Sequence, residues 1–200
     1  MNFVDLFPTV ICTEDIKNNH DISSYVNFIN NIKIIQAHEN KSYGYVTENS
    51  NILNESIFSN LKQLIIKKGL LYLEELGHVV EDLQISNSWG NVLDKEQLIG
   101  SHLHTNSYIS GVLYLTNSSS IRFKNPLVQK DHFTPARTVN TNNFRSITGF
   151  NITPSPGLMV IFPSWLEHGA SPSEVDNRIS IAFNIIPKGK FGFPTAELNL

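Results

Sequence analysis

Cysteine is almost absent from this sequence of 200 residues, since Cys12 is the only one. A single cysteine allows no intramolecular disulfide, no redox pair and no cysteine-rich zinc site, which suits a reducing compartment. An excess of charge of one sign is also lacking: 15 Lys and Arg stand against 18 Asp and Glu, a net charge of −3. This balance excludes a polybasic nucleic-acid surface and an acidic disordered tail as organising features.

Long apolar runs are missing as well. No run approaches about 20 residues, the length that a membrane-spanning helix needs. The first residues, Met1 to Asp5, lack the basic and apolar segments of a secretory signal. We therefore expect a cytoplasmic protein without a membrane segment. A chain of 200 residues can bury a sizeable core, so we expect residues 1–200 to form a single domain.

Helical spacing dominates the first third of the chain, and strand-like patterns dominate the rest. Apolar residues recur at three and four positions over 23–36 and again from Asn54 to Gly77, after a short strand-like segment at 6–12. Asn54 is a typical helix N-cap, and Gly77 is a typical helix stop. Apolar and β-branched runs then predict strands at 84–92, 108–116, 120–125, 157–162 and 178–187.

Helices first and strands afterwards predict an α+β fold whose larger part is an antiparallel sandwich or barrel. We expect residues 1–83 to supply a strand and supporting helices, and residues 84–187 to form the barrel core. The polar stretch 130–156 is longer than a usual hairpin connection. It is either a plain loop, which its composition favours, or a cover over an active site.

Three of the seven histidines are spaced as metal ligands would be. His102 and His104 flank one residue, and on an extended chain such side chains point to the same side about 7 Å apart. The pair alone also fits two polar residues on an exposed strand face. His168 follows an apolar strand at a predicted corner, from which tertiary folding can bring it to the pair. The remaining four are isolated and are interpreted as structural or solvated: His20, His38, His78 and His132.

The last predicted strand alternates apolar and polar residues. Alternation places Arg178, Ser180 and Asn184 on one face and the isoleucines on the other. The polar face is either ordinary solvent-facing surface or a clamp for a dicarboxylate, since Arg binds a carboxylate bidentately and Ser adds a neutral donor. Arg178 is one of only four arginines, and it comes ten residues after His168. This short spacing links the candidate anion clamp to the candidate metal ligands.

In this order the motifs resemble the iron(II)- and 2-oxoglutarate-dependent oxygenase superfamily. Its double-stranded β-helix presents H-x-D/E, a distant His, and Arg-x-Ser about ten residues further on. More narrowly, residues 89–184 are similar to a 2OG-Fe(II) oxygenase family known from bacteria and phages. The stretches that carry this likeness are Ser88–Val92, His102–Leu115, Gly157–His168 and Arg178–Asn184.

The resemblance implies a double-stranded β-helix of jelly-roll or cupin-like type that binds iron(II), 2-oxoglutarate as cosubstrate, and O2. The implied activity is that of a dioxygenase that hydroxylates a second substrate, a small molecule or a peptide, and releases succinate and CO2. The residues that the resemblance assigns are the iron ligands His102, His104 and His168, the carboxylate clamp Arg178 and Ser180, and the further cosubstrate contacts Asn91 and Asn184.

His104 departs from the superfamily pattern, which has a carboxylate at this position. Three neutral histidines leave a divalent metal with its full charge and can admit Zn²⁺, Ni²⁺ or Mn²⁺. One alternative is therefore a cupin-like metal-binding protein with a three-histidine site that is not a 2-oxoglutarate oxygenase. Another is a binding module without turnover. Trp89 and Tyr114 are expected in the core, and Glu167 on the surface.

Overall fold

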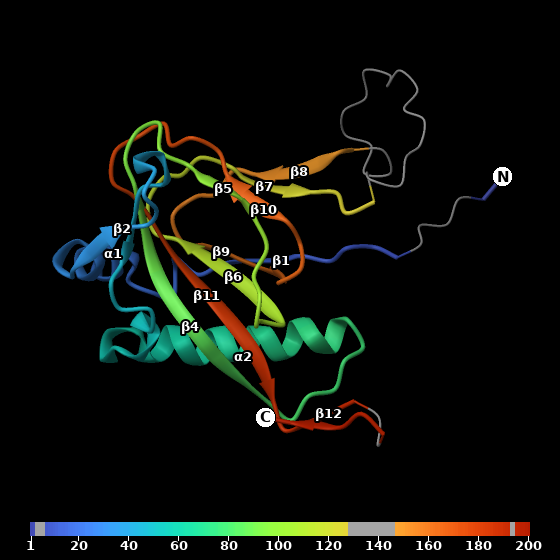
Figure 1. The fold of residues 1–200 in the computed structure, drawn as a ribbon. Helices are drawn as coiled ribbons and strands as arrows, with labels where there is room; N and C mark the ends of the chain where they lie inside the picture. Colours follow the sequence, from blue (N-terminus) through green and yellow to red (C-terminus); the bar gives the residue numbers. More distant parts are fainter. Residues whose placement is uncertain (3–6, 128–146, 193–194) are drawn as a thin grey trace.

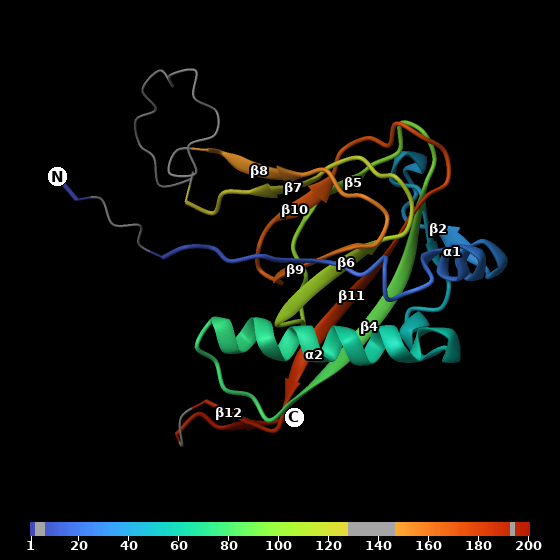
Figure 2. The ribbon, with the colours of Figure 1, turned by 180° about the vertical axis from the view of Figure 1, so that it is seen from behind.

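Two antiparallel sheets lie against each other, and the helices pack outside the larger one (Figures 1 and 2). The computed structural model describes residues 1–2, 7–127, 147–192 and 195–200. Within these residues, no helix is both long enough and apolar enough to cross a membrane.

The larger sheet has seven strands, each antiparallel to its neighbours. Its longest pairing joins β11 to β4 and forms the middle of the sheet. In sheet order the strands are β1 (Cys12–Asp15), β9 (Leu158–Pro163), β6 (Ile109–Tyr114), β11 (Arg178–Lys188), β4 (Asp82–Leu93), β3 (Tyr45–Thr47) and β2 (Ile34–Gln36).

The smaller sheet has four short strands, in the order β5 (Ile99–His102), β10 (His168–Ala170), β7 (Ile121–Lys124) and β8 (Gly149–Ile152). A separate hairpin pairs β12 with β13 near the C-terminus. The remaining elements are β12 (Lys190–Phe191), β13 (Leu198–Asn199), helices α1 (Ile22–Asn31) and α2 (Ser59–Glu75), and the 3-10 turns η1 (Lys41–Tyr43), η2 (Ile52–Asn54) and η3 (Ser56–Phe58).

Helix α2 crosses the outer face of the larger sheet, as both views show (Figures 1 and 2). It buries Leu61, Ile65 and Leu73 against the sheet. Gly69 allows a close approach between helix and sheet, because a Cβ there would stand 2.8 Å from Leu83 Cδ1. Helix and sheet therefore share one apolar layer, and its burial is the main favourable contribution to folding.

The two faces of β11 belong to different layers. Ile179, Ile181, Phe183 and Ile185 lie in the core cluster under the helices, as alternation predicts. The opposite face of the strand's first part borders the space between the two sheets, where Tyr114 and Phe162 of the larger sheet pack with Phe123 of the smaller one. Arg178, Ser180 and Asn184 are therefore buried between the sheets and do not face solvent.

The α+β class and the double-stranded β-helix architecture are confirmed, while the first third of the chain differs from its prediction. The strand expected at 6–12 is β1, a few residues later, and two further strands extend the larger sheet. The helix predicted over 23–36 ends at Asn31, because Ile34–Gln36 pairs with β3 at the sheet edge. Asn54 is not the N-cap of α2, since it ends a 3-10 turn and the helix begins at Ser59.

The polar stretch 130–156 is only partly a loop. Residues 149–152 form β8, an edge strand of the smaller sheet. The prediction of a loop or an active-site cover falls mainly on residues 128–146, which lie outside the described residues.

Candidate functional site

Three histidines meet where the smaller sheet faces the larger one. His102 ends β5, His168 begins β10, and the two are register partners. His104 follows β5, and its backbone N–H donates to the Ser164 carbonyl at the end of β9 (3.0 Å). One ring nitrogen from each histidine lies within 4.8 Å of the other two. The structure thus brings together the three histidines that the sequence singled out.

Hydrogen bonds orient two of these rings. Nδ1 of His102 lies 2.8 Å from the Gly100 carbonyl, and Nδ1 of His168 lies 2.8 Å from the Leu166 carbonyl. A carbonyl only accepts, so Nδ1 carries the hydrogen in both rings and Nε2 keeps its lone pair. This is the tautomer that a metal-binding histidine needs when Nε2 is the ligand.

The spacing of the nitrogens fits one metal ion. Nε2 of His104 and Nε2 of His168 are 3.3 Å apart. Two nitrogens that each lie about 2.1 Å from one ion, at nearly right angles, are separated by about 3 Å. Imidazole is a good ligand for iron, zinc and nickel. The donor set therefore fits a divalent transition metal.

Burial keeps two of the imidazoles uncharged. The pKa of His168 is lowered to about 3 and that of His104 to about 4, mainly by desolvation, and the neighbouring His102 contributes in the same direction. His104 is stacked between Trp89 (ring centroids 5.9 Å apart) and His168 (5.1 Å). At neutral pH both rings are therefore unprotonated, as metal binding requires.

The histidines open onto a cavity of about 160 Å³ between the sheets. Its walls are mostly apolar, and polar groups lie at its two ends. We call the ends the histidine end (His102, His104 and His168) and the arginine end (Arg178, Ser180 and Tyr114). Residues that line the cavity also include Trp89, Asn91, Ile121, Phe162 and Ala182.

Arg178 is a buried cation, with only 1% of its surface exposed. Its Nε donates to Ser118 Oγ and its Nη1 to Ser180 Oγ (3.1 Å), and its guanidinium lies 5.3 Å from the centre of the Tyr114 ring. Among the described residues, no carboxylate forms an ion pair with it. Burial lowers its pKa, which is the effect expected of a cation that is not compensated.

The two asparagines occupy different positions. Asn91 lines the cavity opposite Ser180 in the strand register, and its Oδ1 accepts from Trp89 Nε1 (3.2 Å). Asn184 lies beyond the cavity lining, buried beside Ser110, whose hydroxyl donates to its Oδ1 (2.7 Å). Only Asn91 is therefore placed where a molecule in the cavity would touch it.

Sequence reasoning missed part of the arginine end. Tyr114 is buried as expected, yet its ring faces Arg178 and lines the cavity. Trp89 is only half-buried and stacks on His104. Ser118 lies in a loop and accepts a hydrogen bond from Arg178, and no sequence pattern around Ser118 predicts this contact. Ser110 stands inside an apolar strand in the sequence, and this polar residue is the one signal there of a polar network between the sheets.

The other histidines and Glu167 lie outside this site. His20 is bonded to Tyr25 and His38 packs on Tyr43, while His132 falls outside the described residues. Glu167 faces away from His168, where it accepts from Ser101 (2.8 Å) and pairs with Lys124 (2.9 Å).

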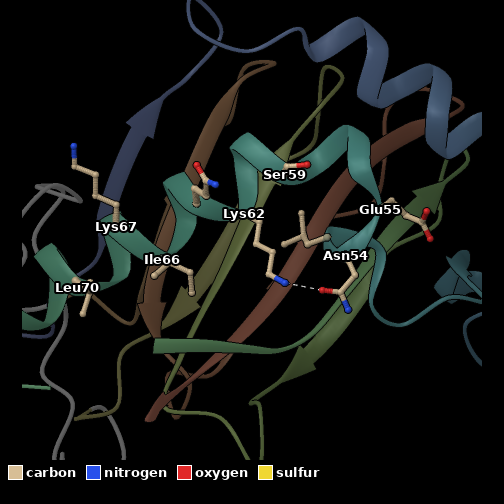
Figure 3. A pocket seen from close by; sticks show the side chains of 9 residues that line it. Asn54, Glu55, Ser59, Lys62, Ile66, Lys67 and Leu70 are labelled. Atoms are coloured by element: carbon tan, nitrogen blue, oxygen red, sulfur yellow. Dashed lines mark hydrogen bonds between the residues drawn. The ribbon is translucent and has the colours of Figure 1, made fainter. Parts of the chain in front are cut away.

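A second, wider hollow runs along α2 (Figure 3). It has a volume of about 580 Å³, and Lys62 donates to Asn54 across it (2.7 Å). Leu53, Ile66 and Leu70 supply apolar surface. Its lining includes neither a histidine nor an arginine, so it combines none of the chemistry found between the sheets.

Part of the chain matches a known protein family. The model of a family described as "Putative 2OG-Fe(II) oxygenase" matches residues 87–184. This range includes the three histidines and Arg178. A search of curated proteins gives no match.

Several solved structures share the fold. A Pseudomonas putida prolyl-4-hydroxylase is 13% identical with a TM-score of 0.63, over 90% of this chain and 94% of that one. HygX from Streptomyces hygroscopicus, solved with nickel, 2-oxoglutarate and hygromycin B, is 13% identical with a TM-score of 0.60, over 90% and 83%. SnoN, an alpha-ketoglutarate-dependent epimerase of nogalamycin biosynthesis, is 8% identical with a TM-score of 0.66, over 94% and 81%.

Proposed function

Because the chain belongs to the iron(II)- and 2-oxoglutarate-dependent oxygenase superfamily, we propose that it is a dioxygenase that hydroxylates a second substrate and releases succinate and CO2. Residues 1–200 act as one domain in this proposal, since β1, β2 and β3 belong to the same sheet as the strands of 84–187. The second substrate is a small molecule or a peptide.

The observation that carries the proposal is a buried arginine without an ion-pair partner that shares one small cavity with three histidines. No Asp or Glu lines this cavity. With a divalent metal, the two ends together carry about three positive charges, because the imidazoles are neutral and Arg178 is charged. Buried charge without a partner is costly. A dianionic ligand such as 2-oxoglutarate offsets most of it.

Each end then has a role. His102, His104 and His168 hold the iron through Nε2. Arg178 and Ser180 bind the far carboxylate of 2-oxoglutarate, Tyr114 supports the guanidinium, and Asn91 contacts the cosubstrate from the opposite strand. Bound iron(II) supplies the oxidative chemistry with O2. The protein holds the reactants in place and keeps bulk water out of the apolar cavity.

The cavity size bears on the second substrate. About 160 Å³ is well below the usual range for pockets that enclose drug-sized ligands. A five-carbon keto acid suits it, whereas a second substrate must approach from outside. His102 is the most exposed of the three ligands, so the substrate reaches the metal on its side.

The test is turnover of 2-oxoglutarate without a second substrate. Purified protein with iron(II), 2-oxoglutarate, ascorbate and O2 should form succinate slowly, and the Arg178→Met protein should form far less at a keto-acid concentration that half-saturates the wild type. If the wild type forms no succinate and its metal-loaded form does not bind 2-oxoglutarate, the cupin-like alternative holds: a three-histidine metal protein in which Arg178 binds another anion.

A further inference from the structure

Trp89 lies between the two ends of the cavity and contacts a residue on each side. Its ring stacks on His104, with the ring centroids 5.9 Å apart and an angle of 27° between the planes. Its indole Nε1–H donates to Asn91 Oδ1 (3.2 Å), and Asn91 is the register partner of Ser180 at the arginine end. Trp89 and Asn91 both line the cavity. One side chain therefore connects a candidate metal ligand with the residue opposite the anion clamp.

Strand geometry fixes where these two side chains lie. Trp89 and Asn91 are two residues apart on β4, so both point to the same face of the sheet. Their register partners on β11 are Ala182 and Ser180, which also line the cavity. The long antiparallel pairing of β4 with β11 holds all four positions. The indole and the amide therefore face the cavity because of the sheet and not because of a loop.

The indole decides which end of the Asn91 amide faces the cavity. An indole N–H only donates, so the atom that meets it is Oδ1, and Nδ2 is the other end of the amide. Within the described part of the chain, no acceptor bonds Nδ2, and no buried side-chain N or O atom lacks a partner. Nδ2 is therefore accessible, and the space that Asn91 borders is the cavity. Asn91 presents donor hydrogens there.

Ser180 is arranged in the same way. A guanidinium only donates, so Ser180 Oγ is the acceptor in its bond with Arg178 Nη1 (3.1 Å). The hydroxyl hydrogen of Ser180 has no acceptor among the described residues and is left for a molecule in the cavity. Asn91 and Ser180 thus stand side by side, each with its acceptor used by a neighbouring side chain and its hydrogen free. A ligand that meets both must offer acceptors, as a carboxylate does.

A structural role for Trp89 alone would require only that its N–H finds some acceptor. The bond to Asn91 has a further effect. Without it, the Asn91 amide could turn Oδ1 toward the cavity, where the oxygen would repel an anion. The indole therefore removes an orientation of Asn91 that is unfavourable for a dicarboxylate.

We propose that Trp89 is a positioning residue for 2-oxoglutarate: its N–H holds Asn91 Oδ1, so that the Asn91 amide turns its N–H groups into the cavity and donates to an oxygen of the cosubstrate. Because the same indole stacks on His104, it also sets Asn91 at a fixed place relative to the metal ligands. The identity of the ligand rests on the proposed function, whereas the orientation of Asn91 does not depend on it.

The first arm of the test reads the indole hydrogen bond directly. Trp89 and Trp165 are the two tryptophans of the chain, and Trp165 is 56% exposed. In ¹⁵N-indole-labelled protein they give two N–H signals, which Trp165→Phe assigns. Asn91→Leu should move the Trp89 signal upfield and speed its exchange with solvent, because the acceptor is lost. Asn91→Asp keeps an acceptor and should leave the hydrogen bond intact. The Trp165 signal should stay unchanged in both variants.

The second arm is a double-mutant cycle on ligand affinity, measured by titrating 2-oxoglutarate into zinc(II)-loaded protein. Trp89→Phe keeps an aromatic ring but loses the N–H, so affinity should fall about fivefold while zinc affinity stays within twofold. In the Asn91→Leu background the same change should cost nothing more, because Trp89 acts through Asn91. Asn91→Asp should lose about 100-fold, since its carboxylate faces an anion. Trp165→Phe is the matched control and should bind as the wild type does.

Additive losses from Trp89→Phe and Asn91→Leu would overturn the proposal, because Trp89 would then act independently of Asn91. A Trp89 indole signal that Asn91→Leu leaves unchanged would also overturn it. If Trp89→Phe does not fold, the indole signals in Asn91→Leu and Asn91→Asp decide. If the wild type binds no 2-oxoglutarate, the proposed function fails, and the same signals decide whether Trp89 orients Asn91.

Discussion

The histidine end and the arginine end of the cavity are built from different sheets and differ in charge. The histidine end lies where β5 and β10 of the smaller sheet meet, and burial keeps His104 and His168 neutral. The arginine end lies on β11 of the larger sheet and buries a charge that cannot be neutralised by losing a proton. One end is therefore prepared for a cation and the other for an anion.

This difference shows how one small cavity can hold two ligands of opposite charge in a fixed order. Four residues along β11 separate Arg178 from Ala182, which lies opposite Trp89 at the histidine end. Such a span is about 13 Å of strand. A metal at one end and a carboxylate at the other can thus be bridged by one short, extended molecule.

The largest expected effect comes from removing the most buried ligand. His168→Gln should weaken cobalt(II) or iron(II) binding by about 1,000-fold, since changes to groups that only support ligands already cost 10- to 100-fold. Isothermal titration measures it. His78→Gln, at an exposed histidine outside the site, is the control and should bind metal as the wild type does. Equal affinity of both variants would remove His168 from the metal site.

Arg178→Met should separate the two ends. We expect about a 100-fold loss of 2-oxoglutarate affinity, because charged hydrogen bonds to a carboxylate are lost, and metal affinity within threefold of wild type. The metal-free variant should also unfold at a higher urea concentration, because an unpaired buried charge has gone. Parallel loss of metal and keto-acid binding would mean that Arg178 is structural.

Acid should destabilise the metal-free protein through the histidine end. Burial lowers the pKa of His168 to about 3 from its ordinary 6.5. Between these values the unfolded chain binds a proton that the folded chain does not, so stability is complete above pH 6.5 and is lost as the pH falls. This one group contributes a slope of about 1.4 kcal/mol per pH unit.

Urea denaturation at pH 7, 6 and 5 with a chelator present measures that slope. His168→Gln should have a shallower pH dependence than the wild type, and His78→Gln an unchanged one. A wild-type slope retained in His168→Gln would show that other groups cause the acid sensitivity.

The smallest expected effect concerns the orientation of Arg178. Ser118→Ala removes the acceptor for Nε while the Ser180 contact remains. Losing one hydrogen bond of this kind should weaken 2-oxoglutarate binding about fivefold and leave metal binding unchanged. Fluorescence competition with a keto-acid analogue can resolve this. An affinity equal to wild type would show that Ser180 and Tyr114 are sufficient to hold the guanidinium.

Sequence patterns predicted the parts of this site that follow strand periodicity. The alternation along β11 placed Arg178 and Ser180 on one face, and the H-x-H spacing placed His102 and His104 on one side of an extended chain. These positions depend only on neighbours in the chain, so local rules suffice.

The remaining features depend on contacts between distant segments. Asn184 shares the face of Arg178, yet it lies further along β11, where its neighbour is Ser110 of β6 and not the cavity. The strands β2 and β3 are three residues each and exist because β4 extends far enough to pair with them. No periodicity over so few residues distinguishes such a strand from a loop.

The central claim is that one molecule of 2-oxoglutarate joins the two ends of the cavity, with iron at the histidine end. The most direct measurement is the visible absorption of anaerobic iron(II)-loaded protein titrated with 2-oxoglutarate, for the wild type and Arg178→Met side by side. The account predicts a saturable charge-transfer band in the wild type and a titration midpoint shifted upward about 100-fold in the variant. No band in the wild type, or the same midpoint in both proteins, would contradict it.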